Sequence, residues 1–349
     1  DPMLQDGLGQ AYESTLDWPK AFAAYRRAIA LNPKDSSYAL NMGLALLRSD
    51  PNGNIKDRRD LAIQYLRDAT KLNPQGAPAF LQLGLLYIEK KRWTEAQDAL
   101  RRYVTLNKDD FIGLFNLALS YDYAGNKFDD ALKFYSQAEA LQPQDPAVKN
   151  NVGRIYLKRK LYDDAIAQFR KALEIDADFI DARNNLALAL AAKDDLAGSN
   201  AEWKKLIDSA TASLKRFQTP AQRAETQQRI IAARAALAEN YLKDKLYADS
   251  AAEYKALLKL APNNLAAMSN LGLALYHTRE YAQSLKYYDE ILKRQPNNAV
   301  AHNNRGVVLE AMNNRGAALA AYKKAVELKP DYAEAKSNRD RLLAATVVS

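Results

Sequence analysis

Short segments of this chain repeat at intervals close to 34 residues. Six amphipathic stretches each end at a proline: Pro33, Pro74, Pro143, Pro262, Pro296 and Pro330. The spacings between them, 41, 69, 119, 34 and 34 residues, are multiples of 34 with 7, 1 and 17 residues added in the first three. A unit of this length cannot bury its apolar face alone, so it must stack on neighbouring units. The repeat therefore predicts one elongated array rather than several globular domains.

The pattern inside one unit predicts its local structure. In residues 77–108 the apolar and small residues that follow i, i+3, i+4, i+7 spacing are Phe80, Leu83, Gly84, Tyr87, Ala96, Leu100 and Tyr103. A polar break at residues 90–92 separates the first four from the rest. Because this spacing places side chains on one face of a helix, the unit is expected to be helix, turn, helix. The same skeleton recurs nine times along the chain.

This skeleton resembles that of the tetratricopeptide repeat family. Small residues such as Gly84 and Ala96 allow the two helices to approach closely, and a proline ends the second helix because it lacks a donor and clashes with the preceding turn. The resemblance covers essentially the whole chain. It implies an all-α fold, a right-handed α-solenoid of stacked antiparallel helix pairs, with about nine repeats and a C-terminal capping helix.

Departures from the 34-residue period divide the expected array. We expect four segments: N-terminal repeats at 1–198, comprising repeats 1–5 and the first helix of repeat 6; a lengthened helical elbow at 199–235; C-terminal repeats at 236–330; and a capping helix and tail at 331–349. Trp203 lies in the first lengthened helix of the elbow, and Thr219 precedes Pro220 as expected of a helix N-cap. The elbow is either a spacer that changes the superhelical pitch or a contact for a partner.

Composition limits the classes of function. There is no cysteine, and 50 basic residues against 42 acidic ones give a net charge of +8 on a mixed surface. This balance favours acidic partners but is not the basic stripe of a nucleic-acid-binding protein. No apolar run approaches the roughly 20 residues of a membrane span, so direct membrane insertion is not expected. Because Asp1 starts directly on the first repeat, we expect an upstream segment to have been removed; a periplasmic or envelope location is favoured over a cytoplasmic one.

Candidate catalytic or metal-binding residues are sparse. The chain has two histidines, His277 and His302, and it has no HExxH, glycine-rich phosphate loop or GxSxG sequence. Paired aspartates such as Asp129 and Asp130 fall near the starts of second helices, where negative charge suits the helix dipole. The sequence therefore predicts a protein without catalytic activity, cofactor or metal.

A polar residue recurs on the first helix of most units, just before the apolar and small pair. The residues at this position are Asn41, Gln82, Asn116, Asn151, Asn185, Asn270 and Asn304. Asparagine costs about half a kcal/mol relative to alanine inside a helix, which suggests a compensating hydrogen bond. The family resemblance implies that these residues line a concave groove and hold an extended peptide backbone. The alternative is that each amide ties neighbouring repeats together and contacts no ligand.

Three residues further along, the first helices carry an apolar strip. Its members are Leu44, Leu85, Leu119, Leu188 and Leu273, with Arg154 and Val307 as variants. A strip of this kind beside an amide row suits a peptide with hydrophobic side chains. Alternatively, the leucines add only to packing between repeats. The peptide-binding residues expected from both rows are Asn41, Gln82, Leu85, Asn116, Leu119, Asn151, Arg154, Asn185, Leu188, Asn270 and Asn304.

These features lead to three functional hypotheses. The first is a non-enzymatic protein-interaction scaffold whose groove binds an acidic or hydrophobic peptide segment, by family analogy in assembly of a bacterial envelope, pilus or motility complex. The second is the substrate-recruiting arm of a larger enzyme such as a glycosyltransferase. The third is self-association through an apolar groove that accepts a neighbour's terminal helix.

Overall fold

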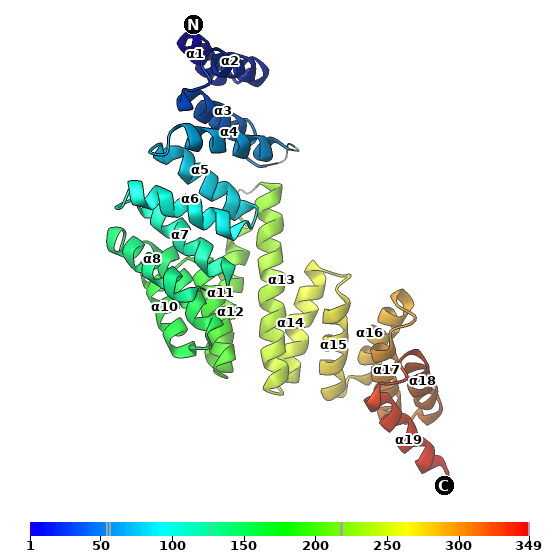
Figure 1. Ribbon diagram of the computed structural model, residues 1–349. Coiled ribbons are helices and arrows are strands. Elements are labelled where there is room, and N and C mark those ends of the chain that lie inside the picture. Colours follow the sequence, from blue (N-terminus) through cyan, green and yellow to red (C-terminus); the bar gives the residue numbers. More distant parts are fainter. Residues whose placement is uncertain (54, 56, 126, 217–218, 348–349) are drawn as a thin grey trace. The chain divides into compact units, whose positions relative to one another are not determined.

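The computed structural model describes residues 1–53, 55, 57–125, 127–216 and 219–347. Within these ranges the chain forms nineteen α-helices and no strand (Figure 1). The helices of the first repeats are α1 (Pro2–Ser14), α2 (Trp18–Leu31), α3 (Ser36–Arg48), α4 (Arg58–Leu72), α5 (Ala77–Glu89), α6 (Trp93–Leu106), α7 (Phe111–Ala124), α8 (Phe128–Leu141) and α9 (Pro146–Lys158). The remaining helices are α10 (Tyr162–Ile175), α11 (Ile180–Ala192), α12 (Leu196–Ser213), α13 (Pro220–Lys243), α14 (Tyr247–Leu260), α15 (Leu265–His277), α16 (Tyr281–Arg294), α17 (Ala299–Ala311), α18 (Arg315–Leu328) and α19 (Ala333–Val347).

The chain divides into two compact units. The first is Asp1–Leu161, with α1 to α9, and the second is Tyr162–Ser349, with α10 to α19. Within each unit, consecutive helices pack on one another. The expected all-α class of packed helix pairs is confirmed. The expected boundaries after residues 198, 235 and 330 all fall inside the second unit, and the roles assigned to the four segments stay predictions.

The helix ends follow from local sequence. Each of the six repeat prolines lies two residues beyond the last residue of a second helix, as Pro262 does after α14. After four of these prolines an aspartate or asparagine, Asp35, Asp145, Asn264 or Asn298, caps the next first helix. For example, the Asn264 side chain accepts a hydrogen bond of 3.0 Å from the backbone N–H of Ala267. Among the described residues, eight of the turns between paired helices contain one residue with φ between 57° and 79°: Leu16, Lys91, Gly125, Lys160, Asp194, Lys245, Arg279 and Asn313. The α3–α4 connection contains two, Gly53 and Asp57. In the eight turns, this left-handed residue ends the first helix and reverses the chain.

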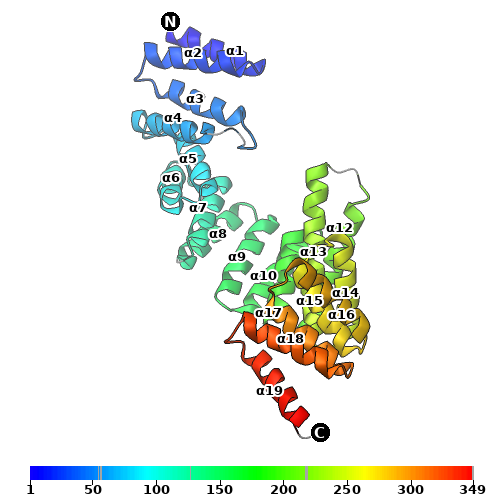
Figure 2. The same ribbon diagram turned by 90° about the vertical axis from the view of Figure 1, so that its right-hand side faces the viewer.

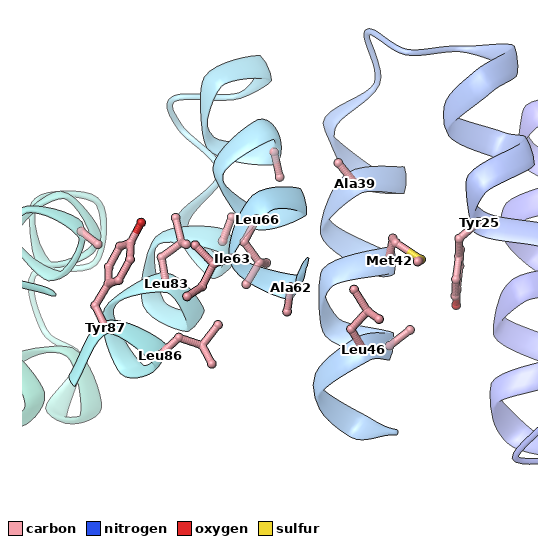
Figure 3. Close-up of a cluster of buried hydrophobic side chains, with 14 of the residues drawn as sticks. Tyr25, Ala39, Met42, Leu46, Ala62, Ile63, Leu66, Leu83, Leu86 and Tyr87 are labelled. Carbon is pink, nitrogen blue, oxygen red and sulfur yellow. The ribbon is translucent and has the colours of Figure 1, made fainter. Parts of the chain in front are cut away.

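The core of the first unit lies between successive helices. Figure 3 shows Tyr25 of α2 facing Met42 and Leu46 of α3, with Leu66 of α4 and Leu83 of α5 continuing the cluster. All five side chains are buried. Small residues permit this packing: a Cβ added to Gly84 would lie only 2.6 Å from Cδ2 of Leu100 on α6. The first and second helices of a repeat therefore touch where the sequence places glycine or alanine.

Two long helices of the second unit span the segment that the sequence predicts to be an elbow. Helix α12 has 18 residues and α13 has 24, and α13 and α14 run side by side in both views (Figures 1 and 2). Thr219 caps α13 as the sequence predicts, because its hydroxyl accepts from Gln222 N–H while the Gln222 side chain accepts from Thr219 N–H. Trp203 is buried against Ile230 and Leu237 of α13. Residues 217–218 lie outside the described part.

Helix α19 covers the last repeat. Ala335 and Leu342 are buried and Tyr332 is half-buried. Arg341 forms an ion pair with Glu310 of α17, with 2.8 Å between Nη2 and Oε2. The last two residues of the expected tail, 348 and 349, lie outside the described residues.

Candidate functional site

The candidate site is the face of the first helices that carries the amide and leucine rows, here named the groove face. In the first unit it belongs to α1, α3, α5, α7 and α9, and in the second unit to α11, α13, α15 and α17. The structure places every expected site residue on one of these helices: Asn41, Gln82, Leu85, Asn116, Leu119, Asn151, Arg154, Asn185, Leu188, Asn270 and Asn304. The two units therefore each carry part of the row.

Two amides of the row connect neighbouring repeats. Asn41 Nδ2 donates to Asp6 Oδ1 on α1 at 2.9 Å, and Asn270 Nδ2 donates to the hydroxyl of Tyr254 on α14 at 2.9 Å. In both cases the acceptor belongs to the preceding repeat. Asparagine has a poor helix propensity, and at these two positions a hydrogen bond within the chain offsets that cost.

In two repeats of the second unit, the tyrosine of the preceding second helix interacts with the amide of the next first helix. Burial raises the pKa of Tyr254 to about 12, while its hydrogen bond with Asn270 acts in the opposite direction. Burial also raises the pKa of Tyr288 well above its ordinary value, and Asn304 of the next repeat again opposes the shift. In these two repeats of the second unit the amide interacts with the tyrosine hydroxyl. After Tyr25, by contrast, Asn41 donates to Asp6 and the tyrosine hydroxyl donates to Glu13.

Two other amides of the row, Gln82 and Asn116, follow a second helix that carries leucine instead of tyrosine. The residue at the tyrosine position before Asn116 is Leu100, and Asn116 Nδ2 donates at 2.8 Å to the carbonyl of Ile112 on its own helix. Leu66 occupies the tyrosine position before Gln82, and within the described residues the half-buried Gln82 side chain makes no hydrogen bond. These two amides do not link repeats.

Three amides accept from the preceding residue on the same helix. The Oδ1 atoms of Asn151, Asn185 and Asn304 lie 3.4–3.5 Å from the Nδ2 atoms of Asn150, Asn184 and Asn303. At these distances the contacts are weak. The amide row is thus one sequence position with several different hydrogen-bonding environments.

The leucine row is more accessible in the second unit than in the first. Leu188 on α11 is 44% exposed and Leu273 on α15 is 39% exposed. Leu85 and Leu119 of the first unit are half-buried. Exposed leucines on the faces of two helices of one unit are an accessible apolar surface beside the amides.

Arg154 belongs to an ion-pair network on the groove face. Its Nη2 lies 3.5 Å from Oδ2 of the fully buried Asp122 on α7, and Lys158 Nζ lies 2.5 Å from Asp122 Oδ1. Arg154 also donates to Asn151 Oδ1 at 3.2 Å and lies over the ring of Tyr123. One buried carboxylate thus holds two cations, which reduces the positive charge that this part of the face offers to a ligand.

The pairing of a first-helix carboxylate with a cation of the following repeat recurs, which the sequence-based predictions did not include. Glu13, Asp122 and Glu310 each lie four residues after the small residue of a first helix and pair with Arg48, Lys158 and Arg341 of the following repeat. The hydroxyls of Tyr25 and Tyr322 donate to Glu13 and Glu310 at 2.9 and 2.8 Å. The fixed four-residue offset was the available signal.

Both histidines contact their own chain. His277 stacks on Tyr247 with ring centroids 4.1 Å apart, and His302 Nε2 lies 2.8 Å from the carbonyl of Pro296. Among the described residues, no group of three or more His, Asp or Glu side chains could hold a metal ion. In that same part of the chain, no helix has the length and apolar character needed to cross a membrane.

Tyr254 predicts a pH-dependent stability of the second unit. Because its folded pKa of about 12 exceeds the ordinary value of about 10, its contribution is complete below pH ~10 and is lost as the pH rises through about 12. Urea unfolding measured at several pH values between about 10 and 12 should show that the free energy of unfolding falls less with rising pH for Tyr254→Phe than for the wild type. Identical pH profiles would refute this assignment.

Comparisons with known proteins agree with the geometry. Sequence profiles described as tetratricopeptide repeat match residues 56–111, 235–299 and 299–332, and a TPR repeat profile matches 153–194. Together they cover more than half of the chain. The chain is 25% identical over 165 residues to the BBSome complex member BBS4 of Bos taurus, covering 47% of this chain and 30% of that protein. It is 24% identical over 182 residues to the human protein O-mannosyl-transferase TMTC3, covering 49% of this chain and 18% of that protein.

A solved structure shows the same fold. The C-terminal part of a TPR repeat-containing protein from Cytophaga hutchinsonii superposes with a TM-score of 0.59 at 19% identity, covering 78% of this chain and 99% of that one. The chain matches less than a third of the length of each of the two sequence relatives. The helix pairs, their periodic glycines and prolines, and the profile matches lead to one conclusion: the chain belongs to the tetratricopeptide repeat family.

Proposed function

We propose that this chain is a non-enzymatic scaffold that binds an extended segment of a partner protein on its groove face. The observation that carries the proposal is the exposure of Leu188 and Leu273, which the packing of the second unit leaves accessible on α11 and α15. Apolar side chains of a bound segment would gain by removing this surface from water. The family membership and the similarity to a BBSome complex member support a role in protein assembly.

The amides contribute unequally to this binding. Asn116 and Gln82 make no link to another helix within the described residues, so their polar groups are the ones available to a peptide backbone. Asn41 and Asn270 use their donors inside the chain, which leaves their oxygens as acceptors for peptide N–H groups. Because net hydrogen bonds contribute about 0.5–1.5 kcal/mol each and ordering a peptide offsets part of this, affinities in the micromolar range are expected, near −8 kcal/mol.

Peptides selected by the chain test the proposal. Immobilised residues 1–349 would select binders from a random peptide library on phage, and affinities would be measured by fluorescence anisotropy. The double variant Leu188→Asp, Leu273→Asp is expected to weaken binding at least about tenfold, because it places charge in the apolar contact. Since both leucines are exposed, the variant should keep its helix content.

A matched control separates the groove face from general surface apolarity. Leu141→Asp with Leu260→Asp changes two leucines that are 39% and 41% exposed at the ends of α8 and α14, away from the groove face. This control should bind the selected peptides like the wild type. The proposal is wrong if the Leu188→Asp, Leu273→Asp variant binds the peptides as tightly as the control does. It is also wrong if the phage selection enriches no peptide.

The finer assignment to assembly of a bacterial envelope, pilus or motility complex rests on family analogy alone. A second candidate, the substrate-recruiting arm of a larger enzyme, is favoured by the similarity to protein O-mannosyl-transferase TMTC3. A reading frame that encodes a transferase domain beside these repeats would support the second candidate. A frame without one would support the scaffold.

A further inference from the structure

A pocket lies between helices α2, α3 and α4 of the first unit. Its volume is about 540 Å³, within the range of about 300–1,000 Å³ that small-molecule sites have. Met42 and Leu46 of α3 are its most deeply buried lining residues, at 1% and 3% exposed, and Phe22 of α2 and Leu61 of α4 complete an apolar surface around them. The pocket shares no residue with the amide row or the leucine row. It is therefore a candidate site separate from the groove face.

The long connection between α3 and α4 supplies part of the pocket wall. Nine residues, 49–57, join these two helices, whereas three residues join the paired helices of the other repeats, as between α5 and α6. Ile55 and Asp57 of the connection line the pocket, and residues 54 and 56 lie outside the described part of the chain. The residues added to the first proline spacing thus contribute to a concave surface.

The lining carries more uncompensated positive than negative charge. Arg26 and Arg58 line the pocket, and neither forms an ion pair with another described residue. Of the two lining aspartates, Asp60 is paired with Lys90 at 2.6 Å between Oδ1 and Nζ, and Asp57 has no such pair among the described residues. Two cations against one anion leave one positive charge. A ligand with a single negative charge complements this lining.

Both arginines lie beside Phe22. Arg26 follows Phe22 by four residues, so the two side chains share one face of α2. The guanidinium of Arg58 lies over the Phe22 ring, 5.3 Å from its centroid. A hydrogen bond of 2.8 Å from Nη1 of Arg58 to the hydroxyl of Ser49 holds this guanidinium in place. Because a guanidinium has five N–H donors, both arginines retain donors for a carboxylate at the edge of the apolar surface.

We propose that this pocket binds a small aliphatic carboxylate, a molecule with an apolar chain and one negative charge. The chain covers Met42, Leu46 and Phe22, and its apolar surface leaves water. The carboxylate accepts charge-assisted hydrogen bonds from Arg26 and Arg58. Since no groove-face residue takes part, this binding and the scaffold function can fail independently of each other.

Methyl NMR of protein labelled with [ε-¹³C]methionine tests the proposal. Met42 lines the pocket, and Met268, also buried at 5% exposed, lies in the second unit and serves as the internal control. Titration of residues 1–349 with octanoate should shift the Met42 signal saturably and leave the Met268 signal unchanged. Octylamine has the same chain length and the opposite charge, so it should bind at least about tenfold more weakly.

Neighbouring residues provide matched variants. Arg26→Gln should weaken octanoate binding at least about threefold, because it removes one of the two cations. Arg27 is exposed too but does not line the pocket, so Arg27→Gln changes the net charge equally and should leave the affinity unchanged. Leu61→Glu places a negative charge in the pocket and should abolish binding. Leu72→Glu, at a 42% exposed leucine on the same helix, should not.

Circular dichroism should show the same helix content for all four variants. The proposal is overturned if octanoate does not shift the Met42 signal, or if it shifts the Met42 and Met268 signals together without saturation. Equal binding of octylamine and octanoate, or equal affinities of Arg26→Gln and Arg27→Gln, would also overturn it. If only a peptide such as acetyl-Leu-Leu-Asp-amide shifts the Met42 signal, a protein partner occupies the pocket and the proposal is wrong.

Discussion

Replacing Gly84 by valine is expected to destabilise the first unit by about 3 kcal/mol. A Cβ at Gly84 would lie 2.6 Å from Cδ2 of Leu100, which is fully buried on α6. Because Leu100 has no free space to move into, α5 and α6 must separate or distort. Urea unfolding followed by circular dichroism measures the change, with hydrogen exchange showing which helices open, since repeat arrays need not unfold in one step.

The control for this prediction is the same substitution at Gly7. A Cβ added to Gly7 meets nothing within 4 Å, and valine and glycine differ by less than about 0.5 kcal/mol in helix propensity. Gly7→Val should therefore leave stability nearly unchanged. Equal effects of the two substitutions would show that the close approach of α5 to α6 does not require glycine.

Replacing Trp203 by alanine is expected to cost the second unit about 3–5 kcal/mol. Trp203 is 3% exposed and lies in one cluster with Leu206 of α12 and with Ile230 and Leu237 of α13. Its removal leaves a cavity between the two long helices, which cannot collapse fully because both also pack on other helices. Denaturant unfolding gives the size of the effect, and hydrogen exchange should show lost protection in α13.

Leu246→Ala is the matched control for the elbow. Leu246 is 45% exposed just before α14, so its truncation should change the stability by less than about 1 kcal/mol. A loss below 1 kcal/mol for Trp203→Ala would contradict the packed elbow. It would then favour two long helices that contribute little to the fold of the second unit.

On the groove face, the sequence predicted where the amides lie but not what they bond. The position of each amide was readable, because Asn116 and Asn270 precede the same apolar and small pair. Their hydrogen-bond partners could not be predicted in this way. Asn270 donates to the hydroxyl of Tyr254 in the preceding repeat, whereas Asn116 donates to the carbonyl of Ile112 on its own helix. The difference depends on which second-helix residue faces the amide, and Leu100 offers no hydroxyl where Tyr254 does.

The exposure of individual leucines was also beyond the sequence. Leu188 and Leu85 occupy the same repeat position, yet Leu188 is exposed and Leu85 is half-buried. Periodicity assigns a residue to a helix face, but the side chains of neighbouring repeats decide how much of it they cover. For the same reason the buried Asp122 and its two cations were not foreseen, since the three side chains meet only when α7 and α9 are in contact.

The sequence by itself determined the helices, their ends and their pairing. Apolar spacing near 3.6 residues, a capping Thr219 and prolines such as Pro262 act within a few residues of the chain, so these effects are local. Only the tertiary structure decided which polar groups are satisfied internally and which apolar ones remain exposed. The physical reason is that hydrogen bonding and burial depend on side chains from other repeats, such as Asp6 facing Asn41 across 35 residues.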